Sequence, residues 1–149
     1  MIDADAANRW PILGRADVIV SNGWSSRPVG VWAADCAPIA LFGAAGTVVG
    51  AHAGWRGLAS GVVDVAVDVL SRRGESVVAA VIGPMIHPEC YAFGSDQLAA
   101  VARGVGAEAE AITSVTSDGG AALDVPAAVA AALASPAVPP LPITVSPAA

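Results

Sequence analysis

The feature that most constrains how this chain can fold is a pair of short apolar runs joined by a turn of glycine and alanine. The runs span residues 38–42 and 47–51, and the turn spans residues 43–46. This pattern predicts a β-hairpin, because two strand-like runs separated by a few small residues favour antiparallel pairing. Pairing would bring Cys36 and His52, which flank the runs, towards the same end of a sheet.

Strand patterns and helix patterns alternate along the rest of the chain. Further strands are predicted at residues 16–21, 28–34, 77–82 and 143–145. One helix is predicted to begin near Trp55, with helical apolar spacing from Leu58 onward, and to end near Arg72-Arg73-Gly74. Others are predicted at 95–101 after an N-cap at Ser95, and at 126–133 after an N-cap at Asp124. Residues 85–94 are predicted to be a loop. The expected class is α/β or α+β, and residues 1–149 are expected to form one domain, because no repeat or linker divides them.

The composition limits the kind of partner that the chain can bind. Hydrophobic residues make up 55% of the 149 residues and charged residues 13%, which suits a packed core and not a disordered chain. The formal net charge is −6 and all 7 basic residues are arginine, which argues against nucleic acid and anionic membranes as partners. No apolar stretch approaches the roughly 18 residues of a membrane span. An anionic ligand would have to be bound by a single arginine or by a helix N-terminus, because the chain as a whole is acidic.

The two cysteines, Cys36 and Cys90, would pair only in an oxidising compartment. The N-terminal residues show neither the basic region nor the apolar region of a secretory signal. Both cysteines are therefore expected to be reduced, and the protein is expected to be cytoplasmic.

Cys36 and His52 are the first candidates for chemistry. A thiol and an imidazole at neighbouring strand ends can share one metal ion, or can act as nucleophile and general base. Taken singly, a buried cysteine is usually a small apolar side chain and a lone histidine is usually structural. Two ligands do not complete a catalytic zinc site, which usually has about three protein ligands and a water. The candidates for the remaining positions are His87, Cys90 and water.

Arg56 lies between two glycines, where a strand is expected to end and a helix to begin. Its guanidinium and the first helical N–H groups can converge on a phosphate, whereas the simpler interpretation is a surface arginine that caps a carbonyl. The adjacent Trp55 is either a core residue or a wall on which a planar base stacks. His87 and Cys90 follow the predicted strand 77–82, and α/β sheets often bind ligands at such strand ends.

Three separate motifs occur in a specific order and spacing. They are Ala34-Asp35-Cys36-Ala37-Pro38, His52-Ala53-Gly54-Trp55-Arg56-Gly57, and Ile82-Gly83-Pro84 followed by Cys90-Tyr91-Ala92-Phe93-Gly94. Together they resemble the YfiH/PgeF family of laccase-domain proteins, long labelled multicopper polyphenol oxidases. The resemblance extends over about residues 16–133, and residues 122–126 are similar to the family's late helix.

The resemblance implies a mixed α/β sandwich fold and a zinc-dependent activity on purine nucleosides, with copper as the alternative metal. In this family the activity is phosphorolysis of adenosine, inosine, guanosine and methylthioadenosine, together with deamination of adenosine. Bacterial members are also linked to peptidoglycan editing. The expected partners are therefore a purine nucleoside and phosphate, and the protein is expected to be a monomer or a homodimer.

The matching motifs also imply roles for individual residues. They imply that Cys36 and His52 bind the metal, and that these two residues and Arg56 are catalytic. Substrate binding is implied for Asp35, Trp55, Arg56 and Tyr91.

The chain departs from the family pattern at several places. The family's third metal ligand is a histidine in a Gln-Val-His-Gly motif, and no histidine precedes Cys36. Ala92 stands where the family commonly has glutamate, and the C-terminal Cys-Thr and Ser-Arg/His-Arg motifs are not recognisable after Val145. We therefore expect a chain shortened at both ends, whose metal site binds more weakly than a three-ligand site. A metal-free Cys–His hydrolase or transferase, and a non-catalytic remnant that serves as an interaction module, stay open as alternatives.

Overall fold

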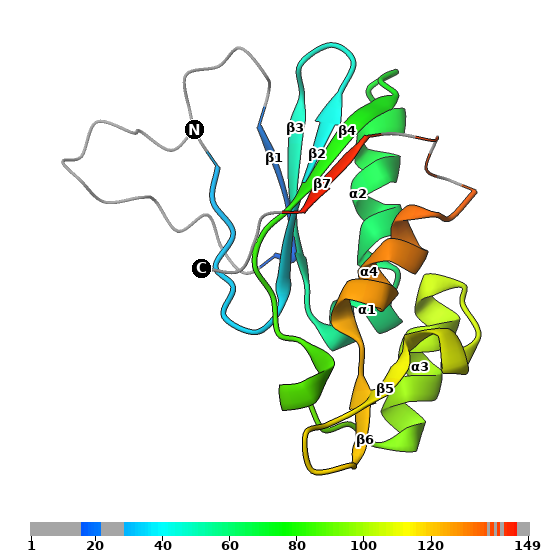
Figure 1. The fold of residues 1–149 in the computed structure, drawn as a ribbon. Helices are drawn as coiled ribbons and strands as arrows, with labels where there is room; N and C mark the ends of the chain where they lie inside the picture. Colours follow the sequence, from blue (N-terminus) through cyan, green and yellow to red (C-terminus); the bar gives the residue numbers. More distant parts are fainter. Residues whose placement is uncertain (1–15, 22–28, 137, 139, 141, 146–149) are drawn as a thin grey trace, which may run out of the picture.

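The structure is a computed structural model that describes residues 16–21, 29–136, 138, 140 and 142–145. Among these residues, a five-stranded sheet has the order β1-β3-β2-β4-β7, and helices pack against one of its faces (Figure 1). Its strands are β1 (Val18–Ser21), β2 (Ala37–Gly43), β3 (Val48–Ala53), β4 (Val77–Ile82) and β7 (Ile143–Val145). A two-stranded sheet of β5 (Thr113–Val115) and β6 (Ala121–Leu123) lies below it in Figure 1, beside α3.

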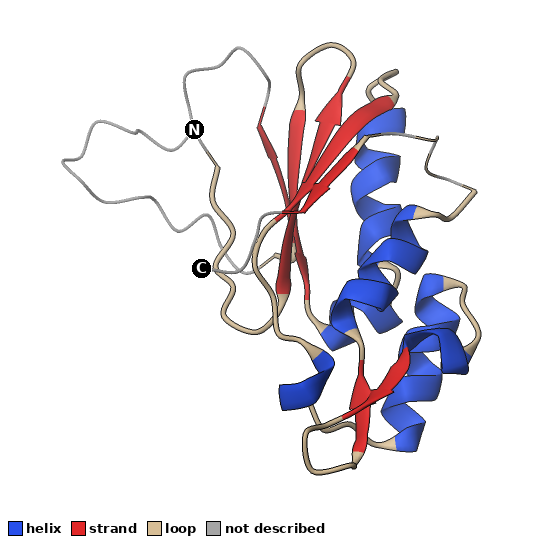
Figure 2. Ribbon diagram, viewed as in Figure 1, coloured by secondary structure: helices blue, strands red, loops and turns tan. Residues whose placement is uncertain are grey.

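The helices lie on one side of the main sheet, as Figure 2 shows. They are α1 (Trp55–Ala59), α2 (Val62–Ser71), α3 (Ser95–Val105) and α4 (Val125–Leu133), with 3₁₀ turns at Pro88–Cys90 and Ala109–Ile112. The α/β class with a mixed sheet and flanking helices is therefore confirmed. In the part of the chain that the structure describes, no helix is long and apolar enough to cross a membrane.

The predicted hairpin is confirmed and forms the centre of the main sheet. β2 and β3 pair antiparallel, with Pro38 opposite His52. β2 alternates between buried and half-buried positions along its whole length. Its buried face, formed by Ala37, Ile39 and Leu41, meets the helices and is at most 2% exposed. This one-sided burial fixes the register, since a slip of one residue would turn these side chains outward.

The other strand predictions have mixed outcomes. β1, β4 and β7 form where strands were expected, and β7 pairs parallel with β4. The strand predicted at residues 28–34 is wrong in its described part, because residues 29–34 form no strand, and Pro28 lies outside the described residues. Both sides of β3 are already paired, with β1 and with β2, so this segment passes over a face of the sheet. There, Cγ2 of Val31 lies 3.1 Å from the position that a Cβ on Gly50 would take.

The helix predicted from near Trp55 to near Arg72 is wrong in its continuity, because two helices occupy this region. α1 begins at Trp55, at the expected strand-to-helix turn, and ends at Ala59, while α2 begins at Val62. Between them Gly61 has a φ of 72°, a left-handed conformation that glycine adopts readily and that interrupts a helix. The sequence pattern hides this break, since the apolar spacing continues across it.

The predicted helix ends are partly correct. The helix expected at 95–101 continues to Val105, and its N-cap is Gly94 in place of Ser95, with no side-chain cap bond. The N-cap Asp124 is confirmed, because its Oδ1 accepts a hydrogen bond from the N–H of Ala127 at 2.9 Å. The loop expected at 85–94 contains the 3₁₀ turn Pro88–Cys90.

Glu75, which lies between α2 and β4, ties these elements to the turn between β2 and β3. Its Oε2 accepts hydrogen bonds from the N–H of Ala45 at 2.9 Å and the N–H of Thr47 at 3.4 Å, and its Oε1 accepts from the Thr47 hydroxyl. Thr47 is only 6% exposed, so its hydroxyl requires a partner within the protein. The bond from the Thr47 hydroxyl, followed by the backbone bonds, lowers the pKa of Glu75.

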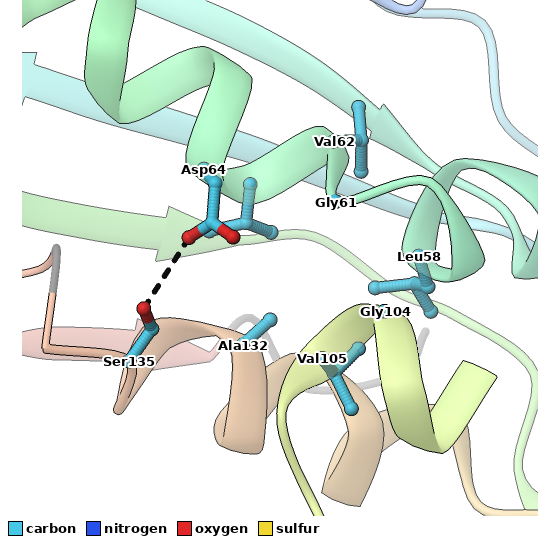
Figure 3. A pocket seen from close by; sticks show the side chains of 9 residues that line it. Leu58, Gly61, Val62, Asp64, Gly104, Val105, Ala132 and Ser135 are labelled. Carbon is cyan, nitrogen blue, oxygen red and sulfur yellow. Dashed lines mark hydrogen bonds between the residues drawn. The ribbon is translucent and has the colours of Figure 1, made fainter. Parts of the chain in front are cut away.

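The backbones of α1 and α3 lie close together at Gly104 of α3. A Cβ on Gly104 would lie 2.3 Å from the carbonyl oxygen of Leu58 and 2.5 Å from backbone atoms of Ala59, both in α1. Figure 3 shows the crevice at this junction, where the hydroxyl of Ser135 donates to Oδ1 of Asp64 at 3.3 Å. Its volume of about 10 Å³ is at most that of one water, so the crevice is a packing gap and not a ligand site.

We expect Gly104→Ala to lower the free energy of unfolding by about 1–3 kcal/mol, because the added methyl group meets the backbone of α1. A Gly→Ala change inside a helix ordinarily has the opposite sign and stabilises by about 0.5–1 kcal/mol. Urea unfolding followed by circular dichroism measures the change. The matched control is Ala100→Gly in the same helix, which should lose only helix propensity. A stabilised Gly104→Ala protein would show that α1 and α3 do not touch at this point.

We expect the stability of the fold at acid pH to depend on Glu75. The pKa of its carboxyl is lower in the folded protein than its ordinary value of 4.5. Its contribution is therefore complete above the ordinary pKa and disappears as the pH falls through the folded pKa. Over this range the free energy of unfolding should fall more steeply in the wild type than in Glu75→Gln. Glu110→Gln, which removes an exposed glutamate elsewhere in the chain, should behave as the wild type, whereas parallel curves for all three proteins would contradict the assignment.

Candidate functional site

The side chains of Cys36 and His52 converge at one end of the central hairpin. Cys36 directly precedes β2 and His52 lies near the end of β3, so antiparallel pairing places them close together. The Sγ atom of Cys36 and the Cε1 atom of His52 lie 2.9 Å and 3.5 Å from the position that a Cβ on Gly54 would take. These two atoms are therefore no more than 6.4 Å apart, the sum of the two distances. A side chain at residue 54 would displace the thiol.

The surroundings of Cys36 disfavour its ionised form. Burial, then the carboxylate of Asp35, then that of Asp17 raise the pKa of the Cys36 thiol. A thiol in such surroundings stays protonated at neutral pH unless a cation lies beside it. The site is therefore better suited to a metal-bound thiolate than to a free thiolate nucleophile.

Asp17 is a residue of this site that the sequence analysis missed. It directly precedes β1, and its Oδ1 lies 3.0 Å from Nδ1 of His52. The backbone N–H of His52 also donates to the carbonyl oxygen of Asp17 at 2.8 Å. The two residues are 35 positions apart, and only the pairing of β1 with β3 brings them together. The sequence offered one weak indication, an aspartate placed directly before a predicted strand.

Aromatic side chains form a row beside the start of α1. The Cζ atom of Arg56 lies 4.4 Å from the centre of the Trp55 ring, which is a cation–π contact. Trp55 meets Phe93 edge to face with ring centres 5.6 Å apart, and Phe93 meets Tyr91 at 5.0 Å. All three rings are partly buried against the core, so Trp55 is in part a core residue. The sequence analysis assigned no role to Phe93, although it lies in the same motif as Tyr91.

The hydroxyl of Tyr91 is within electrostatic reach of the other expected site residues. Burial is the main cause that raises the pKa of Tyr91, and the negative charges of Cys36 and Asp35 raise it further. The Arg56 guanidinium acts in the opposite direction and lowers it. Cys36, Asp35 and Arg56 are therefore near enough to Tyr91 for their charges to affect its hydroxyl.

Backbone hydrogen bonds hold the loop after β4 against the segment that carries Cys36. The N–H of Gly83 donates to the carbonyl oxygen of Pro38, and the N–H of Ile86 donates to that of Asp35, each at 2.8 Å. The loop that contains Tyr91 is thereby fixed relative to β2.

His87 and Cys90, the other metal-ligand candidates, do not join this pair. His87 lines a different, mostly apolar cavity of about 160 Å³ with Met85 and, from α4, Pro126. Cys90 is exposed, and neither cysteine forms a disulfide. Among the described residues, no group of three His, Cys, Asp or Glu side chains is arranged to hold a metal ion. The expectation that His87 or Cys90 completes the metal site has no support, because the loop carries His87 towards α4 and leaves Cys90 on the surface.

The two donors that do converge fit a zinc or copper ion at two coordination positions. Thiolate sulfur and imidazole nitrogen are donors that both metals accept. With Nδ1 of His52 facing Asp17, Nε2 is the ring nitrogen left for a ligand bond. A cation would also offset the carboxylates that disfavour the Cys36 thiolate.

Known proteins are similar in sequence to this chain. The family model described as multi-copper polyphenol oxidoreductase laccase matches residues 1–148. A purine nucleoside phosphorylase of Aquifex aeolicus is 36% identical over 97 residues, which are 64% of this chain and 43% of that protein. Adenosine deaminase RL5, from an unknown prokaryotic organism, is 38% identical over 71 residues, which are 46% of this chain and 27% of that protein.

A solved structure shares the fold. The crystal structure of the hypothetical protein YfiH from Bacillus licheniformis aligns with a TM-score of 0.58 and 28% identity, over 76% of this chain and 44% of that one. The chain thus spans less than half the length of each of these relatives. Because the family match covers nearly all of its residues, the chain belongs to the multi-copper polyphenol oxidoreductase laccase family, the YfiH/PgeF laccase-domain proteins that its motifs resemble.

Proposed function

We propose that this chain acts on purine nucleosides, chiefly as a phosphorylase that uses inorganic phosphate. The observation that carries the proposal is the convergence of Cys36, His52 and Arg56 with an aromatic row at one end of the hairpin. The name of the Aquifex relative supports the same activity. The proposed substrates are adenosine, inosine, guanosine and methylthioadenosine. The proposed setting is the cytoplasm, as a monomer or homodimer, without nucleic acid or membrane as partner.

Phosphorolysis makes one bond at the ribose and breaks another. An oxygen of phosphate bonds to C1′ while the bond from C1′ to N9 of the purine breaks. The electrons of the broken bond stay with the base, which takes up a proton, so the products are the free base and ribose 1-phosphate, or 5-methylthioribose 1-phosphate when the substrate is methylthioadenosine. Positive charge develops on the ribose in the transition state, and groups that orient the anionic phosphate against it therefore accelerate the reaction.

Arg56 is the group that we propose to hold the phosphate. Its guanidinium is exposed and offers several N–H donors, and the cation–π contact with Trp55 steadies its plane. A charge-assisted hydrogen bond of this kind is worth about 1.5–3 kcal/mol. The helix dipole adds less, about 0.3–1 kcal/mol at most, because α1 has only 5 residues. Trp55 and Tyr91 offer ring faces to the purine base.

Cys36 and His52 are proposed to hold a zinc ion, with copper as the alternative. When bound, such an ion supplies Lewis acidity that polarises an oxygen atom beside it. The chain's own contribution is to present a sulfur and a ring nitrogen at one strand end, and to steady the imidazole through Asp17. Two side-chain donors hold a metal less tightly than three, which agrees with a weakened site.

Deamination of adenosine is a second candidate activity, and the relative named adenosine deaminase RL5 supports it. In this reaction the oxygen of water bonds to C6 of the purine and ammonia leaves, so inosine is formed and phosphate is not consumed.

A metal-free Cys–His hydrolase is less well supported, because the raised pKa of Cys36 keeps its thiol protonated. An interaction module linked to peptidoglycan editing is the remaining alternative, and it would show neither metal binding nor turnover.

We expect the dialysed protein to bind zinc through Cys36 and His52, and to release it to a mild chelator. Cys36→Ala and His52→Ala should each abolish binding, which metal analysis and competition with a chromophoric chelator measure. The matched controls Cys90→Ala and His87→Ala remove the same residue types elsewhere and should leave binding unchanged. Binding that persists in Cys36→Ala, or that is lost in a control, would move the metal to another site.

We expect Arg56→Ala to slow phosphorolysis of adenosine about 10- to 150-fold, which corresponds to the loss of about 1.5–3 kcal/mol. Deamination should change little, because only phosphorolysis uses phosphate. The two rates are measured with saturating phosphate and without phosphate. The control is Arg103→Ala, which removes an exposed arginine of α3. Equal losses in the two reactions would assign Arg56 to nucleoside binding or to the fold.

A further inference from the structure

We infer that Asp17 is a positioning residue for His52, whose carboxylate holds the imidazole as the Nδ1–H tautomer and leaves Nε2 with a free lone pair. The inference rests on the proposed function, since it concerns the same Cys36–His52 pair. Asp17 acts by holding the His52 ring, and it does not itself contact substrate or metal.

Two independent contacts fix Asp17 relative to His52. The side chains meet at 3.0 Å between Oδ1 and Nδ1, and the backbones meet at 2.8 Å between the N–H of His52 and the carbonyl oxygen of Asp17. The backbone bond continues the pairing of β1 with β3, in which Val18 lies opposite Ala51. The sheet itself therefore sets the position of Asp17, and the aspartate side chain is too short to reach far from it.

The direction of the side-chain hydrogen bond follows from the chemistry of the two groups. A carboxylate has no hydrogen to donate, so Nδ1 must carry the proton in this bond. In a neutral imidazole the other nitrogen, Nε2, then keeps its lone pair. Cε1, the carbon between the two ring nitrogens, lies 3.5 Å from the Cβ position of Gly54, the same point that Sγ of Cys36 approaches to 2.9 Å. The imidazole ring and the thiol thus lie beside each other next to Gly54.

The Nδ1–H tautomer of His52 is needed whether this residue binds a metal ion or acts as a general base. A metal ligand and a general base both need an imidazole nitrogen without a hydrogen. A neutral imidazole in water prefers to carry its hydrogen on Nε2, which would block that nitrogen. A carboxylate on the opposite nitrogen removes this obstacle, because it fixes the hydrogen on Nδ1 and orients the ring. The side chains of His52 and Asp17 are 34% and 64% exposed, so the bond adds little to stability and its effect is on orientation.

The tautomer can be observed in the metal-free full chain, without any measurement of activity. Two-bond proton–nitrogen correlations of ¹⁵N-labelled imidazoles distinguish Nδ1–H from Nε2–H. The chain has 2 histidines, so His87 is an internal reference. At about two pH units above the usual histidine pKa of about 6.5, we expect Nδ1–H for His52 and mainly Nε2–H for His87. Nε2–H for His52 in the wild-type protein would overturn the inference, whether or not a variant folds.

Metal affinity gives the second measurement, with Co²⁺ as a spectroscopic substitute for zinc. Absorption bands of the cobalt–thiolate unit report the dissociation constant directly. We expect Asp17→Ala to weaken Co²⁺ binding about 10- to 100-fold. The matched control is Asp35→Ala, which removes the carboxylate with the larger effect on the Cys36 thiol but keeps the one bonded to His52. The control should weaken binding less, and an equal or greater loss in the control would mean that Asp17 acts only through its charge.

The tautomer measurement and the activity measurement distinguish failure of the proposed function from failure of the role of Asp17. A chain that turns over no nucleoside would still show the Nδ1–H tautomer of His52 and the difference between the two aspartate variants. An active chain with the Nε2–H tautomer would keep the proposed function and refute the role of Asp17.

Discussion

The register between β2 and β3 is the constraint on which the candidate site depends. Ala51 and Ala53 of β3 are fully buried on the helix side of the sheet, so His52 between them faces the other way. A slip of one residue would turn His52 into the core and away from Cys36. Apolar burial, at about 25 cal/mol per Å², supplies the energy that prevents this slip. The exposed pair of His52 and Asp17 is worth about 1 kcal/mol at most and is held in place by the sheet.

Small residues let neighbouring backbones come close enough to position α1. This helix has only 5 residues and would not form alone, since isolated helices of that length are unstable. Gly104 brings α3 against its backbone, and a Cβ on Gly57 would lie 3.2 Å from the carbonyl oxygen of His52. Gly54 leaves room for the thiol of Cys36. The packing that orders α1 therefore also places Arg56 beside the end of β3.

Local patterns in the sequence predict the features that depend on nearby residues. The central hairpin, the N-cap at Asp124 and the approach of Cys36 to His52 all follow from apolar spacing and a short turn. Features set by distant pairing could not be predicted in this way. Residues 29–34 have a strand-like composition, but both sides of β3 are already paired. Asp17 joins the site only through the pairing of β1 with β3, and the break before α2 depends on one backbone angle at Gly61.

The site favours a cation at one place, beside Cys36, and an anion at another, beside Arg56. Burial, then Asp35 and then Asp17 raise the pKa of Cys36, and the two carboxylates favour a cation beside the thiol. Arg56, on α1, favours an anion, and the hydroxyl of Tyr91 is affected by both sides. The chain as a whole carries a charge of −6, so its general field repels phosphate. Salt screens that field beyond about 8–10 Å, so a phosphate that has come close interacts mainly with the nearby guanidinium. A cation held at the strand ends and an anion held at α1 can then be bound side by side, as the proposed phosphorolysis requires.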